Sequence, residues 1–143
     1  MYSFREKTFN EIKSKGFSFA TFIYLDVKIC QSSKIGENVF IFEYNIIQPF
    51  TKIGNNTILW SGNHIGRYTE IGENCFISSY VVISGKCKLR NNIFIGDNST
   101  LHDCIDLKDN VLVGAGSIIS KDTNTGEFFI PTSTKVFPQK SNQ

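Results

Sequence analysis

The sequence predicts an all-β fold in which short parallel strands wind into a solenoid of triangular coils. Two periodicities carry this prediction: aliphatic residues recur every six positions, and a seven-residue phrase recurs every eighteen. The phrase reads IGENVFI from Ile35, IGNNTIL from Ile53, IGENCFI from Ile71, LRNNIFI from Leu89 and LKDNVLV from Leu107. A fixed internal repeat of this kind is typical of solenoid proteins and is a stronger signal than local propensity.

The six-residue step defines the interior of the predicted coil. From Ile23 to Ile119, all seventeen positions on this step are Ile, Leu or Val. Two positions before each of them stands a mostly small or β-branched residue, such as Val39, Thr57 or Cys75. Residues two apart in a strand share a face, so each hexad sends one small and one large side chain inward. Three hexads close one coil, which predicts a left-handed parallel β-helix of five to six coils.

Asparagine marks one corner of each predicted coil, where the chain must turn sharply. Asn tolerates the left-handed backbone conformation better than any residue except Gly. The corner residues are Asn38, Asn56, Asn74, Asn92 and Asn110. This structural explanation is sufficient for the repeated phrase, which therefore carries no chemistry by itself.

The chain divides into three segments. Residues 1–19 read as a short helix that caps the first coil, and residues 20–122 form the β-helix. The six-residue step fails after Ile119, so residues 123–143 form an extended C-terminal tail. Within this tail the apolar stretch EFFIP is expected to dock on the solenoid.

Outward side chains, one before each inward aliphatic, form three columns. The first column is Phe22, Phe40, Ile58, Phe76, Phe94 and Leu112. The second is Lys28, Ile46, His64, Val82, Thr100 and Ile118, and the third is Lys34, Lys52, Glu70, Lys88 and Asp106. The third column is suited to solvent, whereas the first two expose more apolar surface than a soluble monomer tolerates. We therefore expect a homotrimer about an axis parallel to the solenoid.

Composition excludes several classes of function. The chain has 143 residues, 41% of them hydrophobic, and a formal net charge of +2. With this small charge and no run of basic residues, the sequence gives no sign of a basic surface that would bind nucleic acid. The N-terminal stretch MYSFREKTFNEIKSKG is charged where a signal peptide is apolar, and no run is long enough to span a bilayer. We expect a cytoplasmic protein without membrane insertion.

Cysteines and histidines argue against a metal site. The four cysteines show no CxxC spacing, so neither a zinc site nor a redox motif is indicated. Two histidines, His64 and His102, cannot supply the three imidazoles of a β-helical zinc enzyme. GAGS, at Gly114 to Ser117, lacks the lysine and helix of a phosphate-binding loop.

A long run of the chain resembles a known group of enzymes. WSGNHIGRYTEIGENCFISSYVVISGKCKLRNNIFIGDNSTLHDCIDLKDNVLVGAGSIISKD is similar to the β-helical domain of bacterial sugar acetyltransferases. That group includes sialic acid O-acetyltransferases and nucleotide-linked 4-amino-sugar N-acetyltransferases. The resemblance implies a trimer that binds acetyl-CoA in the cleft between neighbouring subunits and needs no metal.

The resemblance also assigns residues to the coenzyme. Gly85, in VVISG, matches the glycine whose backbone N–H donates to the oxyanion of the thioester carbonyl, a task suited to an exposed N–H. The other residues that the resemblance brings to the coenzyme are Phe76, Asp97, Gly114, Ala115, Gly116 and Lys121. Asp97 and Ala115 line the pantetheine channel, and Lys121 reaches a phosphate.

The general base departs from the family pattern. Arg67 stands where the family has its usual base histidine, and Tyr68 follows it. A guanidinium cannot accept a proton at neutral pH. We expect His64 in NHIG to be the base and take His102, beside Asp103, as a lesser candidate. Two alternatives stay open: a partly unprotonated sugar amine that needs little base assistance, and a degenerate site.

The acceptor side is assigned to two residues. Arg67 is expected to bind a phosphate, of a nucleotide sugar or of coenzyme A, and Asn63 to contact the acceptor. Relatives commonly carry an N-terminal sugar-nucleotide-binding domain, and REKTFNEIKSKGFSFATFI resembles the junction that follows it. Three explanations remain: the trimer holds the acceptor alone, another chain supplies that domain, or the gene is a remnant.

The sequence thus predicts an acetyl-CoA-dependent acetyltransferase. Its acceptor is an amino or hydroxyl group of a nucleotide-linked sugar in surface polysaccharide biosynthesis. The alternative is a non-catalytic trimeric β-helix scaffold or a degenerate acetyltransferase remnant.

Overall fold

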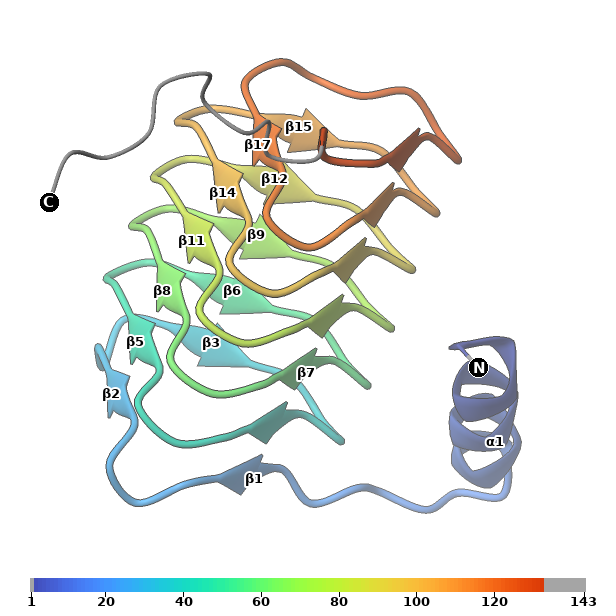
Figure 1. Cartoon of the computed structure of the whole chain (residues 1–143). Coiled ribbons are helices and arrows are strands. Elements are labelled where there is room, and N and C mark those ends of the chain that lie inside the picture. The colour runs from blue at the N-terminus through green and yellow to red at the C-terminus, as the bar shows by residue number, and fades with distance from the viewer. Residues whose placement is uncertain (1, 133–143) are drawn as a thin grey trace, which may run out of the picture.

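The predicted left-handed β-helix is confirmed. A computed structural model describes the backbone of residues 2–132 and the side chains from Phe4 onward. In this part of the chain, helix α1 (Tyr2–Ser14) precedes a parallel solenoid of about six turns (Figure 1). Each strand is two residues long, and the strands form three sheets, one on each side of the coil.

The sheets contain every third strand in chain order. Sheet A consists of β1 (Phe22–Ile23), β4 (Phe40–Ile41), β7 (Ile58–Leu59), β10 (Phe76–Ile77), β13 (Phe94–Ile95), β16 (Leu112–Val113) and β18 (Phe128–Phe129). Sheet B consists of β2 (Lys28–Ile29), β5 (Ile46–Ile47), β8 (His64–Ile65), β11 (Val82–Ile83), β14 (Thr100–Leu101) and β17 (Ile118–Ile119). Sheet C consists of β3 (Lys34–Ile35), β6 (Lys52–Ile53), β9 (Glu70–Ile71), β12 (Lys88–Leu89) and β15 (Asp106–Leu107).

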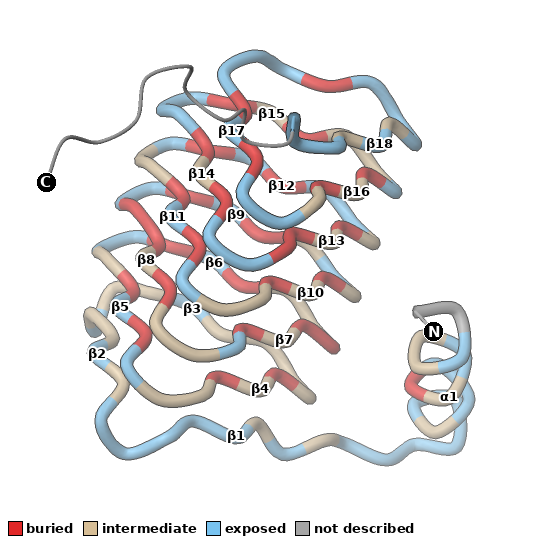
Figure 2. Tube along the Cα trace, viewed as in Figure 1, coloured by how far each residue is buried: buried red, intermediate tan, exposed pale blue. Residues whose placement is uncertain are grey.

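Side chains alternate between the interior and the outside of the coil as the sequence predicts. The second residue of each strand from β4 to β17 is buried, and Figure 2 shows this inward series along all three sheets. Polar residues at the small inward positions bond to backbone. Thr57 Oγ1, for example, donates to the carbonyl of Gly72 at 3.0 Å. Their hydrogen-bonding groups are thereby satisfied away from water.

The tail adds a strand after the six-residue step ends. β18 pairs in parallel with β16, and the N–H of Gly114 donates to the carbonyl of Phe129 at 2.8 Å. The expected docking of EFFIP is therefore confirmed. The remainder of the predicted tail, from residue 133, lies outside the described residues.

From Asn38 to Gly116, each corner of the coil contains a residue in the left-handed conformation. Corner 1 follows sheet A, corner 2 follows sheet B and corner 3 follows sheet C. Corner 3 uses Asn in each coil, at φ between 54° (Asn38) and 61° (Asn110). The Asn side chains also bond along the solenoid: Asn38 Nδ2 donates to Asn56 Oδ1 at 2.9 Å. At corners 1 and 2 the left-handed residues include Tyr44, Phe50, Tyr68 and Tyr80, which the sequence analysis did not predict.

Helix α1 lies beside corner 3 (Figure 1). Arg5 Nε donates to Asn56 Oδ1 at 2.7 Å, and the guanidinium lies 5.3 Å from the centre of the Phe40 ring. The helix therefore does not lie across the end of the first coil, where we expected it as a cap. Ile23 in that coil remains 41% exposed. Charge-assisted hydrogen bonds to the corner hold the helix, together with Phe9, which is buried and stacks on Phe19 with ring centres 4.9 Å apart.

The two apolar columns differ in their cover. The outward rings of sheet A stack on one another, as Phe76 does on Phe94 at 5.6 Å, and α1 covers Phe40. On sheet B, Ile46, Val82 and Ile118 are exposed, the last by 70%. Among the residues that the structure describes, sheet B is therefore the apolar face that lacks cover.

Substitutions of two glycines by alanine are expected to differ in their effect on the free energy of unfolding. A Cβ at Gly54 would lie 2.6 Å from backbone atoms of Gly72, whereas a Cβ at Gly85 would have no neighbour closer than 3.4 Å. Gly54→Ala is expected to lower the free energy of unfolding by about 1–3 kcal/mol through overpacking. Gly85→Ala, the matched control, should change it by less than about 0.5 kcal/mol. Urea denaturation measures both, and equal losses would contradict the geometry.

Candidate active site

His64, the expected base, lies on the outward face of β8 in the middle of sheet B. It is half-buried and aligned between Ile46 of β5 and Val82 of β11. An imidazole on this apolar face is accessible to a substrate, and it is flanked by the two corners at either end of the sheet. The other candidate residues lie at these corners, except Phe76 on sheet A and Asn63 inside the coil.

Corner 2 carries Arg67, Gly85 and Asp103 one above another, eighteen residues apart. The N–H of Gly85 donates to Asp103 Oδ1 at 2.8 Å. Asp103 thus already accepts the hydrogen bond that we expected the Gly85 N–H to donate to the oxyanion. Exposed Lys121 is at the next repeat of this column, and His102 is exposed beside Asp103.

Corner 1 carries the residues expected along pantetheine. Asp97 accepts a hydrogen bond from Ser78 Oγ and one from the Ser79 N–H, the latter at 2.9 Å. These two bonds, the hydroxyl first, lower the pKa of Asp97 and keep it a carboxylate. A carboxylate at a corner that accepts an N–H from the coil below recurs at Asp103, so both aspartates hold the solenoid together.

The glycine-rich stretch next to Asp97 leaves room for a ligand. Gly116 has φ +74°, and a Cβ added to it would meet nothing within 4 Å. Ala115 beside it is exposed. Gly116, Ile118, Ile130 and other residues of this end line a concavity of about 300 Å³. A narrow chain can approach the backbone closely here.

The expected residues do not meet in one pocket of the chain. Asp97 and Asp103 occupy opposite ends of a side of the coil, and six extended residues span at most about 20 Å. Phe76 lies on sheet A, between Trp60 and Phe94. A site that uses both corners, His64 on sheet B and Phe76 on sheet A must involve a second surface.

Asn63 does not belong to the acceptor site that we expected. Its side chain points inward and is 1% exposed. Nδ2 donates to the carbonyl of Trp60 at 2.7 Å, and Oδ1 accepts from the N–H of Val81 at 2.8 Å. The residue fills one of the small inward positions, so it stabilises the coil and cannot contact a sugar.

Arg67 is exposed and adjoins an aromatic pair that the sequence analysis missed. Its guanidinium has no hydrogen bond or ion pair within residues 4–132. Tyr68, the next residue, stacks on Phe50 with ring centres 4.9 Å apart and an interplanar angle of 13°. The available signal was that both aromatics occupy one corner column, eighteen residues apart.

The buried cysteines are not nucleophiles. Burial raises the pKa of the Cys75 thiol to about 12 and also raises the pKa of Cys87. Both thiols donate to backbone carbonyls, Cys75 to Arg90 at 3.2 Å. Protonated thiols at inward positions argue against an acyl-cysteine intermediate.

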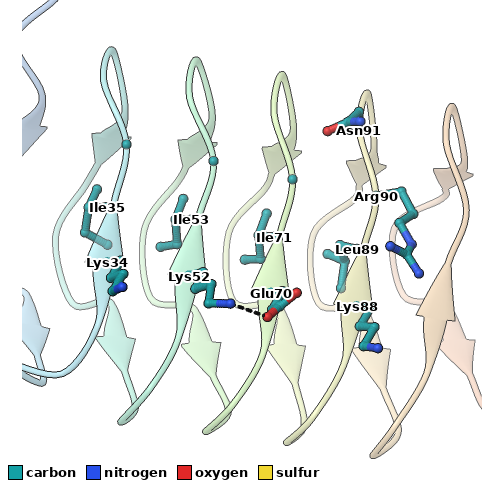
Figure 3. A pocket seen from close by; sticks show the side chains of 13 residues that line it. Lys34, Ile35, Lys52, Ile53, Glu70, Ile71, Lys88, Leu89, Arg90 and Asn91 are labelled. Atoms are coloured by element: carbon teal, nitrogen blue, oxygen red, sulfur yellow. Dashed lines mark hydrogen bonds and ion pairs between the residues drawn. The ribbon is translucent and has the colours of Figure 1, made fainter.

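Sheet C carries an open groove of about 440 Å³, away from His64. Its outward charges include Lys34, Lys52, Lys88 and Glu70, and Figure 3 shows Lys52 paired with Glu70. The pairing distance is 2.7 Å. None of the expected site residues lies in this groove, which fits the prediction that the third column faces solvent.

The described part of the chain holds neither a metal-binding cluster nor a membrane-spanning helix. Within residues 2–132, no three His, Cys, Asp or Glu side chains are grouped so as to hold a metal ion. Over the same residues, no helix is both long enough and apolar enough to cross a membrane.

Comparison with known proteins identifies the family. The repeat described as bacterial transferase hexapeptide (six repeats) matches residues 32–67, 51–85 and 68–103, which together make up half of the chain. The chain belongs to the bacterial hexapeptide transferase family. A related repeat, the hexapeptide repeat of succinyl-transferase, matches residues 86–121. No curated protein matches the sequence.

Solved structures of hexapeptide transferases share this fold. Perosamine N-acetyltransferase from Caulobacter crescentus, in complex with CoA and GDP-perosamine, matches 89% of this chain with TM-score 0.86 and 20% identity. The acetyltransferase domain of PglB from Neisseria gonorrhoeae matches 89% with TM-score 0.55 and 20% identity. A hexapeptide transferase family protein from Anaplasma phagocytophilum matches 77% with TM-score 0.59 and 19% identity.

The chain spans less than the whole of these hexapeptide transferases. It covers 60% of the Caulobacter protein, 62% of the Neisseria domain and 69% of the Anaplasma protein. At such identities the likeness concerns the β-helix alone.

An ion-pair cluster on the last strands of sheet C leads us to expect that the stability of the fold depends on pH. Asp106 accepts two hydrogen bonds from Arg90, at 3.1 and 2.9 Å, and one from Lys108 at 2.8 Å. Arg90 is the main cause that lowers the pKa of Asp106 to about 2. Because a lowered carboxyl pKa stabilises the fold above the unfolded value near 4, this contribution is lost as pH falls from about 4 to about 2.

Asp106→Asn should therefore destabilise the protein at pH 7 by an amount on the order of 1 kcal/mol, since the cluster is partly exposed. The deficit relative to wild type should shrink below pH 4. Urea unfolding at pH 7 and at about pH 3 measures it, and a deficit that does not change with pH would exclude this ion pair as the cause.

Proposed function

We propose that this hexapeptide transferase moves an acetyl group from acetyl-CoA to an amino or hydroxyl group of a nucleotide-linked sugar. Membership of a transferase family carries the proposal, together with the match in fold to coenzyme-bound sugar acetyltransferases. The accessible His64 on sheet B and the open backbone at Gly116 support it. The same observations favour a transferase over a scaffold.

The chemistry is direct transfer. His64 accepts a proton as the acceptor nitrogen or oxygen attacks the thioester carbonyl, and the carbonyl becomes a tetrahedral oxyanion. Collapse of this intermediate breaks the C–S bond, and the coenzyme A thiolate leaves with the proton that His64 returns. The Gly85 N–H can serve the oxyanion only after Asp103 releases it. Arg67 is suited to a phosphate, because its guanidinium is exposed and has no hydrogen bond or ion pair with residues 4–132.

A homotrimer completes the proposed site. Corners 1 and 2 are separated by one face of the coil, and that face, sheet B, carries uncovered apolar residues. A neighbouring subunit packed near sheet B would bring its own corner to His64 and form the cleft for acetyl-CoA. We also place the enzyme in the cytoplasm, where acetyl-CoA and nucleotide sugars are made, and assign it to surface polysaccharide biosynthesis.

Calorimetric titration with acetyl-CoA and transfer assays with amino-sugar nucleotides test the proposal. Wild type should bind one acetyl-CoA per chain. His64→Ala should retain this binding and lower kcat by about a hundredfold or more, as expected for a lost general base. His102→Ala, an exposed control on corner 2, should stay within a few fold of wild type. A normal rate in His64→Ala would exclude His64 as base, and no binding by folded wild type would refute the function.

A charged residue introduced on sheet B should dissociate the proposed trimer into monomers. Wild type is expected to have the mass of three chains by light scattering, and Val82→Glu the mass of one, because it places an unpaired carboxylate in an apolar interface. Lys88→Glu introduces the same residue at the equivalent position of sheet C and should leave the trimer intact. If the two variants behave alike, sheet B is not the interface.

A further inference from the structure

An exposed aromatic pair on corner 2 stands beside Arg67, outside the hydrophobic core of the coil. Phe50 and Tyr68 are each 51% exposed, with rings stacked at 4.9 Å. Stacked and nearly parallel, they form an aromatic platform on the outside of the solenoid, whose free flat surfaces are the outer faces of the two rings. Such a platform is typical of sites that bind planar rings.

The backbone beneath this pair is unfavourable for aromatic residues. Phe50 and Tyr68 have φ of 60° and 59°, a region in which bulky side chains are rare. The equivalent position on corner 3 is Asn in each coil, the residue that this conformation favours. Local conformation therefore does not account for Phe or Tyr at corner 2, and the strain is consistent with a role outside the fold.

Positive charge adjoins the platform. Arg67 precedes Tyr68, and a Cβ added at Gly85 would lie 3.6 Å from Arg67 Cγ, so the arginine side chain passes along the corner toward Gly85. Lys86, exposed, follows Tyr68 in the same corner column. The carboxylate on this corner, Asp103, already accepts the Gly85 N–H. A diphosphate beside the platform would meet a guanidinium and an ammonium.

We propose that corner 2 binds the nucleoside diphosphate part of the acceptor. The nucleobase stacks on the platform of Phe50 and Tyr68, and the pyrophosphate binds Arg67. This inference rests on the proposed function and names how the β-helix itself holds a nucleotide-linked sugar. The nucleobase lies toward the earlier coils, and the sugar reaches the level of His64 and Gly85. Stacking tolerates different bases, whereas the guanidinium requires the phosphates.

Corner 1 offers a matched control. Tyr44 is also exposed and left-handed, with φ of 61°. It has no aromatic partner within residues 4–132, because Gly62 separates it from Tyr80 along the corner. Asn at either position suits the backbone, so Tyr68→Asn and Tyr44→Asn should both fold, and only the first removes the platform.

The experiment is calorimetric titration of full-length protein with UDP, GDP and dTDP, and separately with coenzyme A. Wild type should bind at least one of the nucleotides, and saturating coenzyme A should not displace it. Tyr68→Asn and Arg67→Met should each raise the Kd of that nucleotide about tenfold or more, since stacking and charge-assisted bonds have this magnitude. Tyr44→Asn should bind as wild type, and coenzyme A affinity should not change in Tyr68→Asn.

Several results would overturn the inference while leaving the proposed function intact. These are coenzyme A binding without any nucleotide binding, displacement of the nucleotide by coenzyme A, and equal nucleotide affinity in wild type and Tyr68→Asn. Loss of the oligomer in Tyr68→Asn would also overturn it, since the platform would then be a subunit contact. Nucleotide binding that depends on Tyr68, in a protein that does not bind coenzyme A, would support the platform and refute the transferase.

Discussion

The structure depends on one constraint, the alignment of each coil with the next at a spacing of eighteen residues. From β1 to β17 each strand pairs with the strand eighteen residues away, as Phe76 does with Phe94. A residue's neighbours along the solenoid axis are thus fixed by its number alone. Core, corners and outward columns follow from this alignment, because a shift of one residue would exchange inward and outward side chains.

Much of the fold could be predicted for the same reason. The six-residue step identified the inward aliphatics and two outward apolar columns, but it did not distinguish sheet A, whose rings stack on one another, from the more exposed sheet B. Asn63 was at an inward position in that pattern, and its placement at the acceptor disregarded the alternation. Periodicity also places Phe50 beside Tyr68 and Gly85 beside Asp103, but it could not predict that the two rings stack or that Asp103 bonds the Gly85 N–H. Those contacts depend on side-chain conformations, which the repeat does not determine.

Corners separate structure from function in this chain. At corner 3 the residues suit the backbone, and Asn38 and Asn56 bond along the solenoid and to Arg5. The corners on either side of sheet B are less regular and include aromatic, basic and glycine residues. Departures from the ideal repeat mark the face where binding is proposed, as expected if local rules are broken mainly at functional sites.

The two ends of the solenoid differ in their cover, because only the C-terminal end carries a further strand, β18. It pairs with β16 and extends sheet A past the last regular coil, whereas α1 leaves the first coil uncovered. Because each coil contacts only its neighbours, unfolding of such an array can begin at an end and proceed coil by coil. We therefore expect fraying to be directional, with the N-terminal coil opening before the end that carries Gly114 to Gly116.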